Sequence, residues 1–488
     1  MRYIMKSEKS KPKTKTWMAV VFASFSVLFM GVSLFLSFPS IYQKQVTPEQ
    51  NSERIIKEAI AMSLLDEEQP IRSLRESEST EDYFREYFST LKKPSELTDD
   101  DYKKVKDLYL NDSSIHDITM LSRLTNLEKL DLYNIHVTSI EPLARLKNLQ
   151  SLMLYNMPVS NIEPLGDLTN LQELTLYFLL VSDLSALSNC TNLQTLRLYS
   201  LYQIGNIEPL KNLTNLRELG LIDSKVSDIN TLSSLASLQE LHLSSKQVSD
   251  LRPIENLTNL KTLSLSGTEI RDLSLVSHLI NLQDLYISDT SVSNFEPLAN
   301  LVNLERLYLV DMQVGDIGVL TKLPKLHTLS LEKSRVTSIE PLSSLIALRY
   351  LSLCEPKDRD IQLIANLTNL QSLYLYGTHA VDIRPIANLT NLEVLSLGEL
   401  KISDIGALAQ LPRLQILTVS VARVSDIRSL ARLTNLTSLS LCATNPIDFT
   451  PIAILRKLQT LNLRSTQVTK QQIAGLKKAM PDVYVSGP

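Results

Sequence analysis

Pairs of leucines separated by one residue recur along most of the chain. The pair at Leu130 and Leu132 is followed 22 residues later by the pair at Leu152 and Leu154, and one step of 23 residues precedes Leu219. Between residues 108 and 485 the pattern yields 18 such units. Apolar and polar residues alternate around each pair, which predicts a β-strand with its apolar side chains facing inward.

The residues between these strands carry a second apolar ridge, as in Val137, Ile140, Leu143, Leu146 and Leu149. So few residues join one strand to the next that the chain has to coil, and successive strands have to stack in parallel. A fixed period of this length is typical of solenoids rather than of several globular domains. We therefore expect one continuous repeat array.

A short polar residue precedes the second apolar residue of each ridge, the position of Ile140. From Asp117 to Asp448 it is Asp eleven times, Asn three times and Ser twice. These residue types accept backbone N–H bonds at helix N-termini, so we predict short helices there and interpret the aspartates as caps rather than metal ligands. Asn also precedes the leading Leu in 11 of 16 units, for example at Asn126, which predicts a ladder of amides bonded to loop backbone.

The string LTNLQELTL followed by VSDLSAL resembles the 22-residue leucine-rich repeat of bacterial internalins and related surface proteins. The segments ELTDDDYKKVKDLYL and IAGLKKAMPDVYV are similar to the N-terminal and C-terminal caps of such proteins. This resemblance covers about residues 95–488 and implies an α/β fold, a right-handed horseshoe with a concave parallel β-sheet and short helical turns on its convex side. Host-cell adhesion is not implied, because no cell-wall sorting motif accompanies the repeats.

The N-terminal residues predict a membrane anchor. No charged residue occurs from Thr16 to Gln43, and Trp17–Ile41 is long and apolar enough to cross a bilayer. Six basic residues precede it, so the N-terminus is expected in the cytoplasm and the repeats outside it, at the cell surface or in the periplasm. A cleaved signal peptide is the alternative, although its apolar region is usually shorter.

Two sequence signals suggest helices between the anchor and the repeats. Thr47-Pro48 predicts a helix start, and Thr98 with Asp101 forms a candidate capping box. The expected organisation is a basic cytoplasmic tail (1–16), a transmembrane signal-anchor (17–42), a stalk (43–80), a helical N-terminal cap (81–105), leucine-rich repeats (106–470) and a C-terminal cap (471–488).

Charge and cysteine content argue against several classes of function. The net charge is −4, and the first 42 residues are net positive, so the rest of the chain is acidic. Its overall charge therefore does not favour binding of nucleic acid. Cys190, Cys354 and Cys442 match no metal or redox spacing. Because Cys354 and Cys442 lie four units apart, roughly 19 Å at about 4.8 Å per strand, we predict three free thiols.

Four consecutive units place a tyrosine directly after the second leucine, on the outward side of the strand. At about 4.8 Å per strand these rings should form an aromatic ladder roughly 14 Å long. An exposed aromatic stripe is a candidate surface for a protein, peptide or glycan partner, although repeat duplication alone also produces such a stripe. The candidate residues are Tyr133, Tyr155, Tyr177 and Tyr199, with Phe178 and Tyr202 beside them.

A second aromatic group contains Tyr286 and Tyr308 of adjacent units, flanked by Arg306, Asp289 and Asp311. The two aspartates occupy equivalent positions, and carboxylates of that separation occur in retaining glycosidases. A solvated acidic face is the better interpretation, because an open sheet does not desolvate a carboxylate. A third, looser group consists of Tyr350, Tyr374 and Tyr376.

No sequence signature of catalysis is present. The chain lacks phosphate-loop, zinc-protease, nucleophile-elbow and dinucleotide fingerprints, and its six histidines fall in different units. We therefore expect neither an enzyme nor a cofactor, but a scaffold that binds a partner through its concave face. The alternatives are a structural spacer of the envelope and an intracellular repeat protein resembling a phosphatase regulator.

Overall fold

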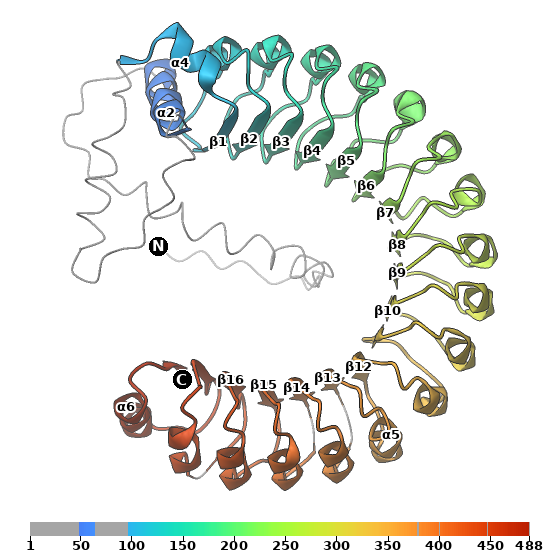
Figure 1. The fold of residues 1–488 in the computed structure, drawn as a ribbon, viewed down its shortest axis with the longest axis vertical. Coiled ribbons are helices and arrows are strands. Elements are labelled where there is room, and N and C mark those ends of the chain that lie inside the picture. The colour runs from blue at the N-terminus through green and yellow to red at the C-terminus, as the bar shows by residue number, and fades with distance from the viewer. Residues whose placement is uncertain (1–47, 64–95, 378–379, 400, 447, 488) are drawn as a thin grey trace, which may run out of the picture.

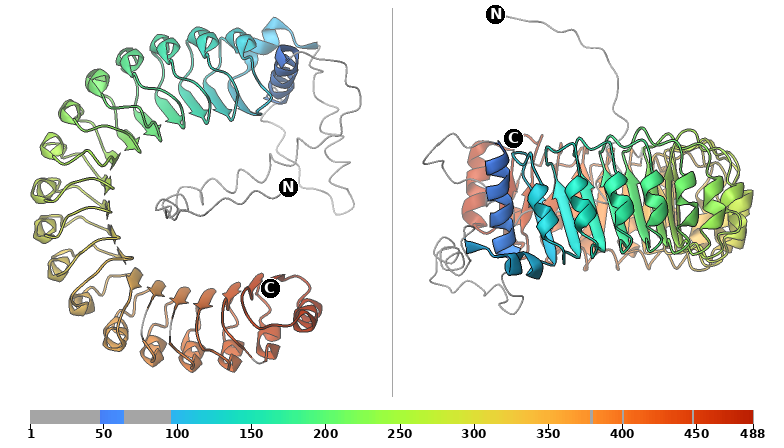
Figure 2. Two further views of the ribbon diagram at one scale, coloured as in Figure 1. Left: turned by 180° about the vertical axis from the view of Figure 1, so that it is seen from behind. Right: turned by 90° about the horizontal axis from the view of Figure 1, so that it is seen from above.

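The computed structural model describes residues 48–63, 96–377, 380–399, 401–446 and 448–487. Figure 1 shows a horseshoe in which the strands line the inner edge and short helices line the outer edge. Seen edge-on in Figure 2, the arc is a band whose height is spanned by the strands. The predicted solenoid with a concave parallel sheet is therefore confirmed.

The inner sheet contains 18 strands, and each strand is parallel to the next one along the chain. The strands are β1 (Asp107–Asn111), β2 (Lys129–Tyr133), β3 (Ser151–Tyr155), β4 (Glu173–Tyr177), β5 (Thr195–Tyr199), β6 (Glu218–Ile222), β7 (Glu240–Ser244), β8 (Thr262–Ser266), β9 (Asp284–Ser288), β10 (Arg306–Val310), β11 (Thr328–Leu331), β12 (Tyr350–Cys354), β13 (Ser372–Tyr376), β14 (Val394–Gly398), β15 (Ile416–Ser420), β16 (Ser438–Ser440), β17 (Thr460–Asn462) and β18 (Tyr484–Ser486).

The strand register places equivalent residues of neighbouring repeats side by side. Leu108 pairs with Leu130, and Leu196 pairs with Leu219, so the extra residue of the 23-residue unit is taken up outside the sheet. The inward leucines are buried and form one continuous core with the apolar ridge of each unit. Burial of apolar surface stabilises a fold by about 25 cal/mol per Å², and every unit repeats this contribution.

The convex side carries one short helix per repeat. These helices are η2 (Thr119–Arg123), η3 (Glu141–Arg145), η4 (Glu163–Asp167), η5 (Ser185–Asn189), η6 (Glu208–Asn212), η7 (Asn230–Ser234), η8 (Arg252–Ile254), η9 (Ser274–His278), η10 (Glu296–Asn300), η11 (Gly318–Lys322), η12 (Glu340–Ser344), η13 (Arg384–Asn388), η14 (Gly406–Gln410), η15 (Arg428–Arg432) and η16 (Thr450–Ile454), all 3₁₀, and the α-helix α5 (Asp358–Ile364).

The polar residues before the ridges do accept backbone hydrogen bonds, but one position earlier than expected. Asp117 accepts the N–H of Thr119 at 2.8 Å, whereas Ile118 occupies the N-cap position itself and makes no side-chain bond. The tight 3₁₀ turn explains this shift, because the side chain spans two residues as in an Asx-turn. Asp360 is an exception: it lies inside α5 and accepts the N–H of Lys357 at 2.7 Å.

The predicted amide ladder is also confirmed. Asn126 donates from Nδ2 to the carbonyl of Lys103 at 3.0 Å, and Asn148 donates to the carbonyl of Thr125 at the same distance. The same bond to the preceding repeat is made by all the other asparagines of this position: Asn170, Asn192, Asn215, Asn259, Asn281, Asn303, Asn369, Asn391 and Asn435.

The helix α2 (Pro48–Ser63) covers the N-terminal end of the sheet. It begins at the predicted Thr47-Pro48 position, within the stretch expected to be a stalk, and packs against β1. Its Ile56 and Ile60 are fully buried in the common core, and Ser52 accepts the backbone N–H of His116 at 2.8 Å. This part of the stretch therefore seals the solenoid, as a cap does.

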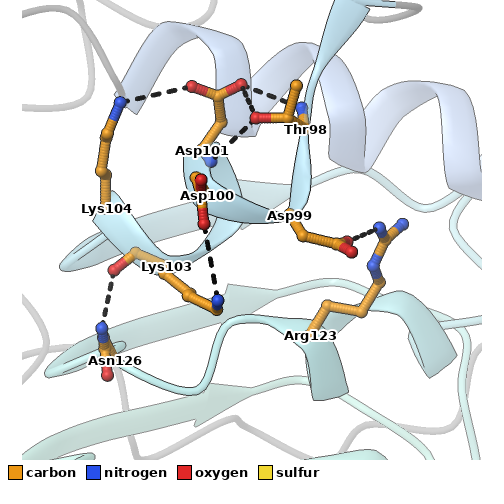
Figure 3. Close-up of polar contacts among 8 residues, drawn as sticks. All are labelled: Thr98, Asp99, Asp100, Asp101, Lys103, Lys104, Arg123 and Asn126. Atoms are coloured by element: carbon orange, nitrogen blue, oxygen red, sulfur yellow. Dashed lines mark hydrogen bonds and ion pairs between the residues drawn. The ribbon is translucent and has the colours of Figure 1, made fainter.

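A second capping element, α4 (Asp99–Lys104), begins with the predicted capping box. Asp101 accepts the backbone N–H of Thr98 at 2.9 Å, and Thr98 accepts the N–H of Asp101 at 3.4 Å (Figure 3). Arg123 of the first repeat forms an ion pair with Asp99. At the other end, α6 (Lys470–Ala479) and β18 close the array.

All three cysteines are free, as predicted. Cys190 is buried, and its thiol lies 3.4 Å from the carbonyl oxygen of Leu165. The predicted anchor, Trp17–Ile41, lies outside the described residues. Within the part of the chain that the structure describes, no helix is long and apolar enough to cross a membrane.

The capping aspartates predict that the protein loses stability in acid. Hydrogen bonds from the hydroxyl and backbone N–H of Ser274 lower the pKa of Asp272 below its ordinary value of 3.8, and the pKa values of Asp183 and Asp448 are lowered too. A carboxylate of this kind stabilises the fold above its unfolded pKa, and the contribution is lost as the pH falls through its folded pKa. We expect Tm to fall between about pH 5 and pH 2, as measured by circular dichroism.

A triple variant, Asp183→Asn, Asp272→Asn and Asp448→Asn, provides the control. Asn161 and Asn206 already accept the same backbone bond in other repeats, at 2.8 and 2.9 Å, without titrating. The variant should therefore fold at neutral pH and lose less of its Tm on acidification. If the variant lost as much Tm on acidification as the parent chain, the capping aspartates would not be the source of the acid sensitivity.

Candidate ligand-binding site on the concave face

The four ladder tyrosines lie at the end of consecutive strands on the concave face. Tyr133, Tyr155, Tyr177 and Tyr199 are cross-strand partners in one row. Successive ring centroids are 5.5, 4.9 and 6.0 Å apart. The Tyr155 and Tyr177 rings stack at 22°, which is the offset arrangement aromatic rings prefer.

The members of this row are not equally accessible. Tyr133 is only 8% exposed, and its hydroxyl lies 2.6 Å from the sulfur of Met153. Tyr109 on β1, which the sequence analysis missed, lies outside this row because Asn111 is the partner of Tyr133; its ring is nevertheless 5.1 Å from that of Tyr133 and it is 39% exposed. Its position between Leu108 and Leu110 points outward, so strand alternation was a signal for it.

Phe178 and Tyr202 continue the aromatic surface past the end of the strands. Phe178 packs edge-on against Tyr177 at 4.6 Å, and the ring of Tyr202, which is 52% exposed, lies 6.5 Å from Phe178. Phe178 has a φ of 52°, a left-handed conformation that most repeats share at this position, from Asn134 to Val421. The repeat geometry therefore imposes this backbone conformation whatever the residue type.

A groove of about 840 Å³ runs along this edge of the sheet. Its asparagines form a chain of side-chain bonds: Asn156 donates to Asn134 at 2.8 Å, and Asn134 donates to Asn111 at 2.9 Å. The sequence analysis did not identify this groove, because its residues follow the strands in an irregular turn. It is lined by Asn111, Asp112, Ser113, Asn134, His136, Asn156, Met157, Pro158, Phe178 and Leu180.

Tyr199 departs from the stack. Its ring meets that of Tyr177 at 86° and lies over Gly220 of the next strand, where a Cβ atom would be 2.4 Å from the Tyr199 Cε1. Burial raises the pKa of the Tyr199 phenol to about 12. The stack of parallel rings therefore ends at Tyr177, because the missing side chain of Gly220 gives Tyr199 a place to fold down.

The second aromatic group is a closely stacked pair. The Tyr286 and Tyr308 rings lie 4.5 Å apart at 9°, and burial raises the pKa of Tyr286 to about 12. Arg306 binds Asp284 with Nη2 2.6 Å from Oδ2, and Asp284 is 5% exposed. The flanking Asp289 has a left-handed φ of 50°, so it belongs to the turn after its strand.

The aromatic residues thus fall into separate groups along the arc. The ladder occupies β2–β5, the stacked pair occupies β9 and β10, and the third group lies on β12 and β13. In that third group the Tyr350 and Tyr374 rings are 5.3 Å apart, and Tyr374 and Tyr376 are 6.4 Å apart. The sequence analysis named these three groups but gave no distance between them.

Between the ladder and the stacked pair lies a polar cluster that sequence reasoning missed. Arg197 binds Glu218 through both nitrogens of its fork, at 2.5 and 2.6 Å. One ligand atom each of Glu218, Glu240 and His242 lie within 4.8 Å of one another. Burial lowers the pKa of His242, and burial together with the charge of Glu218 raises the pKa of Glu240.

Comparisons with known proteins agree with this architecture. One family model, a leucine-rich repeat region, matches residues 203–445, and a second model of two leucine-rich repeats matches residues 103–145. The chain is a leucine-rich-repeat protein. No curated protein matches it in sequence.

Solved structures of other repeat proteins resemble the chain. An internalin (InlF) from Listeria monocytogenes is 23% identical, with 86% of this chain and 96% of that chain covered and a TM-score of 0.41. A leucine-rich-repeat protein from Leptospira interrogans is also 23% identical, with 76% of this chain and 98% of that chain covered and a TM-score of 0.55. At 23% identity, the similarity to the Leptospira protein supports the fold of this chain and nothing further.

The packing of Tyr199 over Gly220 gives a direct prediction. In Gly220→Ala the new methyl group displaces the ring, so the phenol becomes more hydrated and its pKa falls from about 12 toward the ordinary 10.0. The measurement is a pH titration by NMR of ring-labelled tyrosine, with Tyr199→Phe assigning the signal. In the control Gly475→Ala, where a Cβ meets nothing within 4 Å, the Tyr199 pKa should stay high. An unchanged pKa in Gly220→Ala would refute the packing.

Proposed function

We propose that this protein is a membrane-anchored binding scaffold that holds a protein or an extended peptide on its concave face. The observation that carries the proposal is the ladder of stacked, half-buried tyrosines on β3 and β4, continued by Phe178 and the exposed Tyr202. Tyrosine gives a large contact area with few rotatable bonds, and it is enriched at protein interfaces. We propose binding rather than catalysis as the role of the chain.

The orientation of the rings favours a protein over a glycan. The faces of Tyr155 and Tyr177 lie against each other, so the ladder presents ring edges and hydroxyl groups to a partner. Sugars stack on ring faces, whereas polypeptides supply both apolar side chains and backbone groups for hydrogen bonds with phenols. The neighbouring groove, with its row of asparagine amides, offers further polar partners to a polypeptide.

The aromatic side chain of Phe178 supports a binding surface over a spacer without a ligand. Most repeats have a left-handed residue at this position, for example Asn156 and Lys333, so the backbone does not require an aromatic ring there. In a binding surface, the side chain widens the apolar area between Tyr177 and Tyr202.

The anchor and the outward topology belong to the same proposal. The apolar segment Trp17–Ile41 with its preceding basic residues supports an N-terminus in the cytoplasm and repeats outside it. Because α2 begins at Pro48 and packs against β1, only residues 42–47 separate this segment from the cap. The solenoid would then stand close to the membrane, with its concave face open to a partner.

The ladder is tested by the double variant Tyr155→Ser and Tyr177→Ser. We expect immobilised full-length protein to retain its partner from a cell-surface protein fraction, and the double variant to lose this capture. Loss of the stacked pair should cost about 0.5–1.5 kcal/mol beyond the area it buries, so the variant should stay folded with a modestly lower Tm. Capture is measured by quantitative mass spectrometry of the eluted proteins.

Tyr484→Ser is the matched control, because Tyr484 is 71% exposed and lies on β18, far from the ladder. It should capture the partner as well as the parent chain does. Equal capture by the double variant would exclude the ladder as the binding surface. The absence of any specific partner would favour the spacer hypothesis.

The topology predicts that protease digests the repeats when it is added to cells whose inner membrane is intact and whose outer membrane, if there is one, has been permeabilised. Loops of the horseshoe outside the cytoplasm are accessible to an external protease, whereas the basic N-terminus is protected. Immunoblotting with an N-terminal tag should show a short protected fragment only in treated cells. Full protection of the chain, with digestion only after lysis, would overturn the outward orientation.

A further inference from the structure

The polar cluster on β6 and β7 brings together two carboxylates and an imidazole. Glu218 and Glu240 are direct cross-strand partners, and His242 lies two residues after Glu240 on the same face of the sheet. Their nearest ligand atoms lie within 4.8 Å of one another. Three such atoms are close enough to converge on a single ion after small side-chain movements.

The charges of this cluster are only partly balanced by the residues around it, since Arg197 pairs with Glu218 but not with Glu240. Like charges directly opposite each other on neighbouring strands are unfavourable. Arg197 neutralises Glu218 through a bidentate ion pair. In the described part of the chain, Glu240 has no ion pair and the ring of His242 has no hydrogen bond. A cation between these groups would remove the repulsion and use the free imidazole nitrogen.

The ring of Tyr199 forms a wall beside this cluster. It fills the space over Gly220, the cross-strand partner of His242. Arg197 occupies two acceptor positions of Glu218, whereas an ionised carboxylate offers about four. Glu218 can therefore keep its bond to Arg197 and still coordinate an ion, with Arg197 acting as an outer partner that fixes the carboxylate.

We propose that Glu218, Glu240 and His242 form a binding site for a divalent transition-metal ion, with zinc as the preferred occupant. One imidazole nitrogen with carboxylate oxygens suits zinc, whereas calcium and magnesium prefer sites made only of oxygen. Three protein ligands leave a fourth position, which opens onto the concave face. The site is independent of the aromatic ladder, since zinc binding is measured on the chain alone.

The test uses the full-length chain without a histidine tag, freed of metal by chelator and dialysis. Isothermal titration with zinc chloride should show one equivalent bound per chain, and cobalt(II) should give the visible absorption of a four-coordinate site. His242→Gln and Glu240→Gln should each weaken zinc binding by at least about tenfold, because loss of even an outer-shell partner has an effect of about 10- to 100-fold.

Two matched controls distinguish this site from general surface binding. Glu173→Gln removes a carboxylate at the equivalent position of β4. His327→Gln removes a histidine that lies 3.5 Å from Glu305, a pair that has no third ligand among the described residues. Both should bind zinc as the parent chain does. Each variant must also keep its metal-free circular dichroism spectrum and Tm. The proposal is overturned if zinc does not bind saturably, or if His242→Gln and Glu240→Gln bind it unchanged.

Discussion

The whole structure depends on the exact stacking of each repeat on the one before it in a single parallel register. Leu108 pairs with Leu130, and the same pairing of equivalent residues continues to Leu461 with Val485. Because of this register, leucines stack on leucines in the core, and asparagine amides bond to the carbonyls of the preceding repeat. Any side chain repeated at one position becomes a row about 4.8 Å in spacing. The tyrosine ladder is one such row.

Much of this arrangement was predictable from the sequence, because a period of 22 residues leaves few alternatives for the backbone. The period predicted the strands, the amide ladder and the row containing Tyr155 and Tyr177. It did not predict that Tyr133 would be buried or that Tyr199 would fold over Gly220. Those outcomes depend on side-chain rotamers and on the size of diagonal neighbours, which a repeat pattern does not specify.

The polar cluster was missed for a related reason. Sequence reasoning compared the histidines with one another and found no shared unit, whereas the partners of His242 are glutamates from its own strand and the adjacent one. Side chains on neighbouring strands meet even when they occupy different positions of the repeat. The left-handed turn at Phe178 was likewise invisible, since a phenylalanine at that position predicts no such backbone.

The two capped ends of the arc have a consequence for the protein in solution. Uncovered parallel strands at the ends of a sheet are templates on which other chains can add. Here Ile56 and Ile60 of α2 close the core next to β1, and α6 packs at the opposite end beside β18. A chain cut after residue 63 would leave the first strand open while α6 still covers the other end, so that two solenoids would pair through their N-terminal ends and go no further. The N-terminal helix thus keeps this end of the array from adding a second molecule.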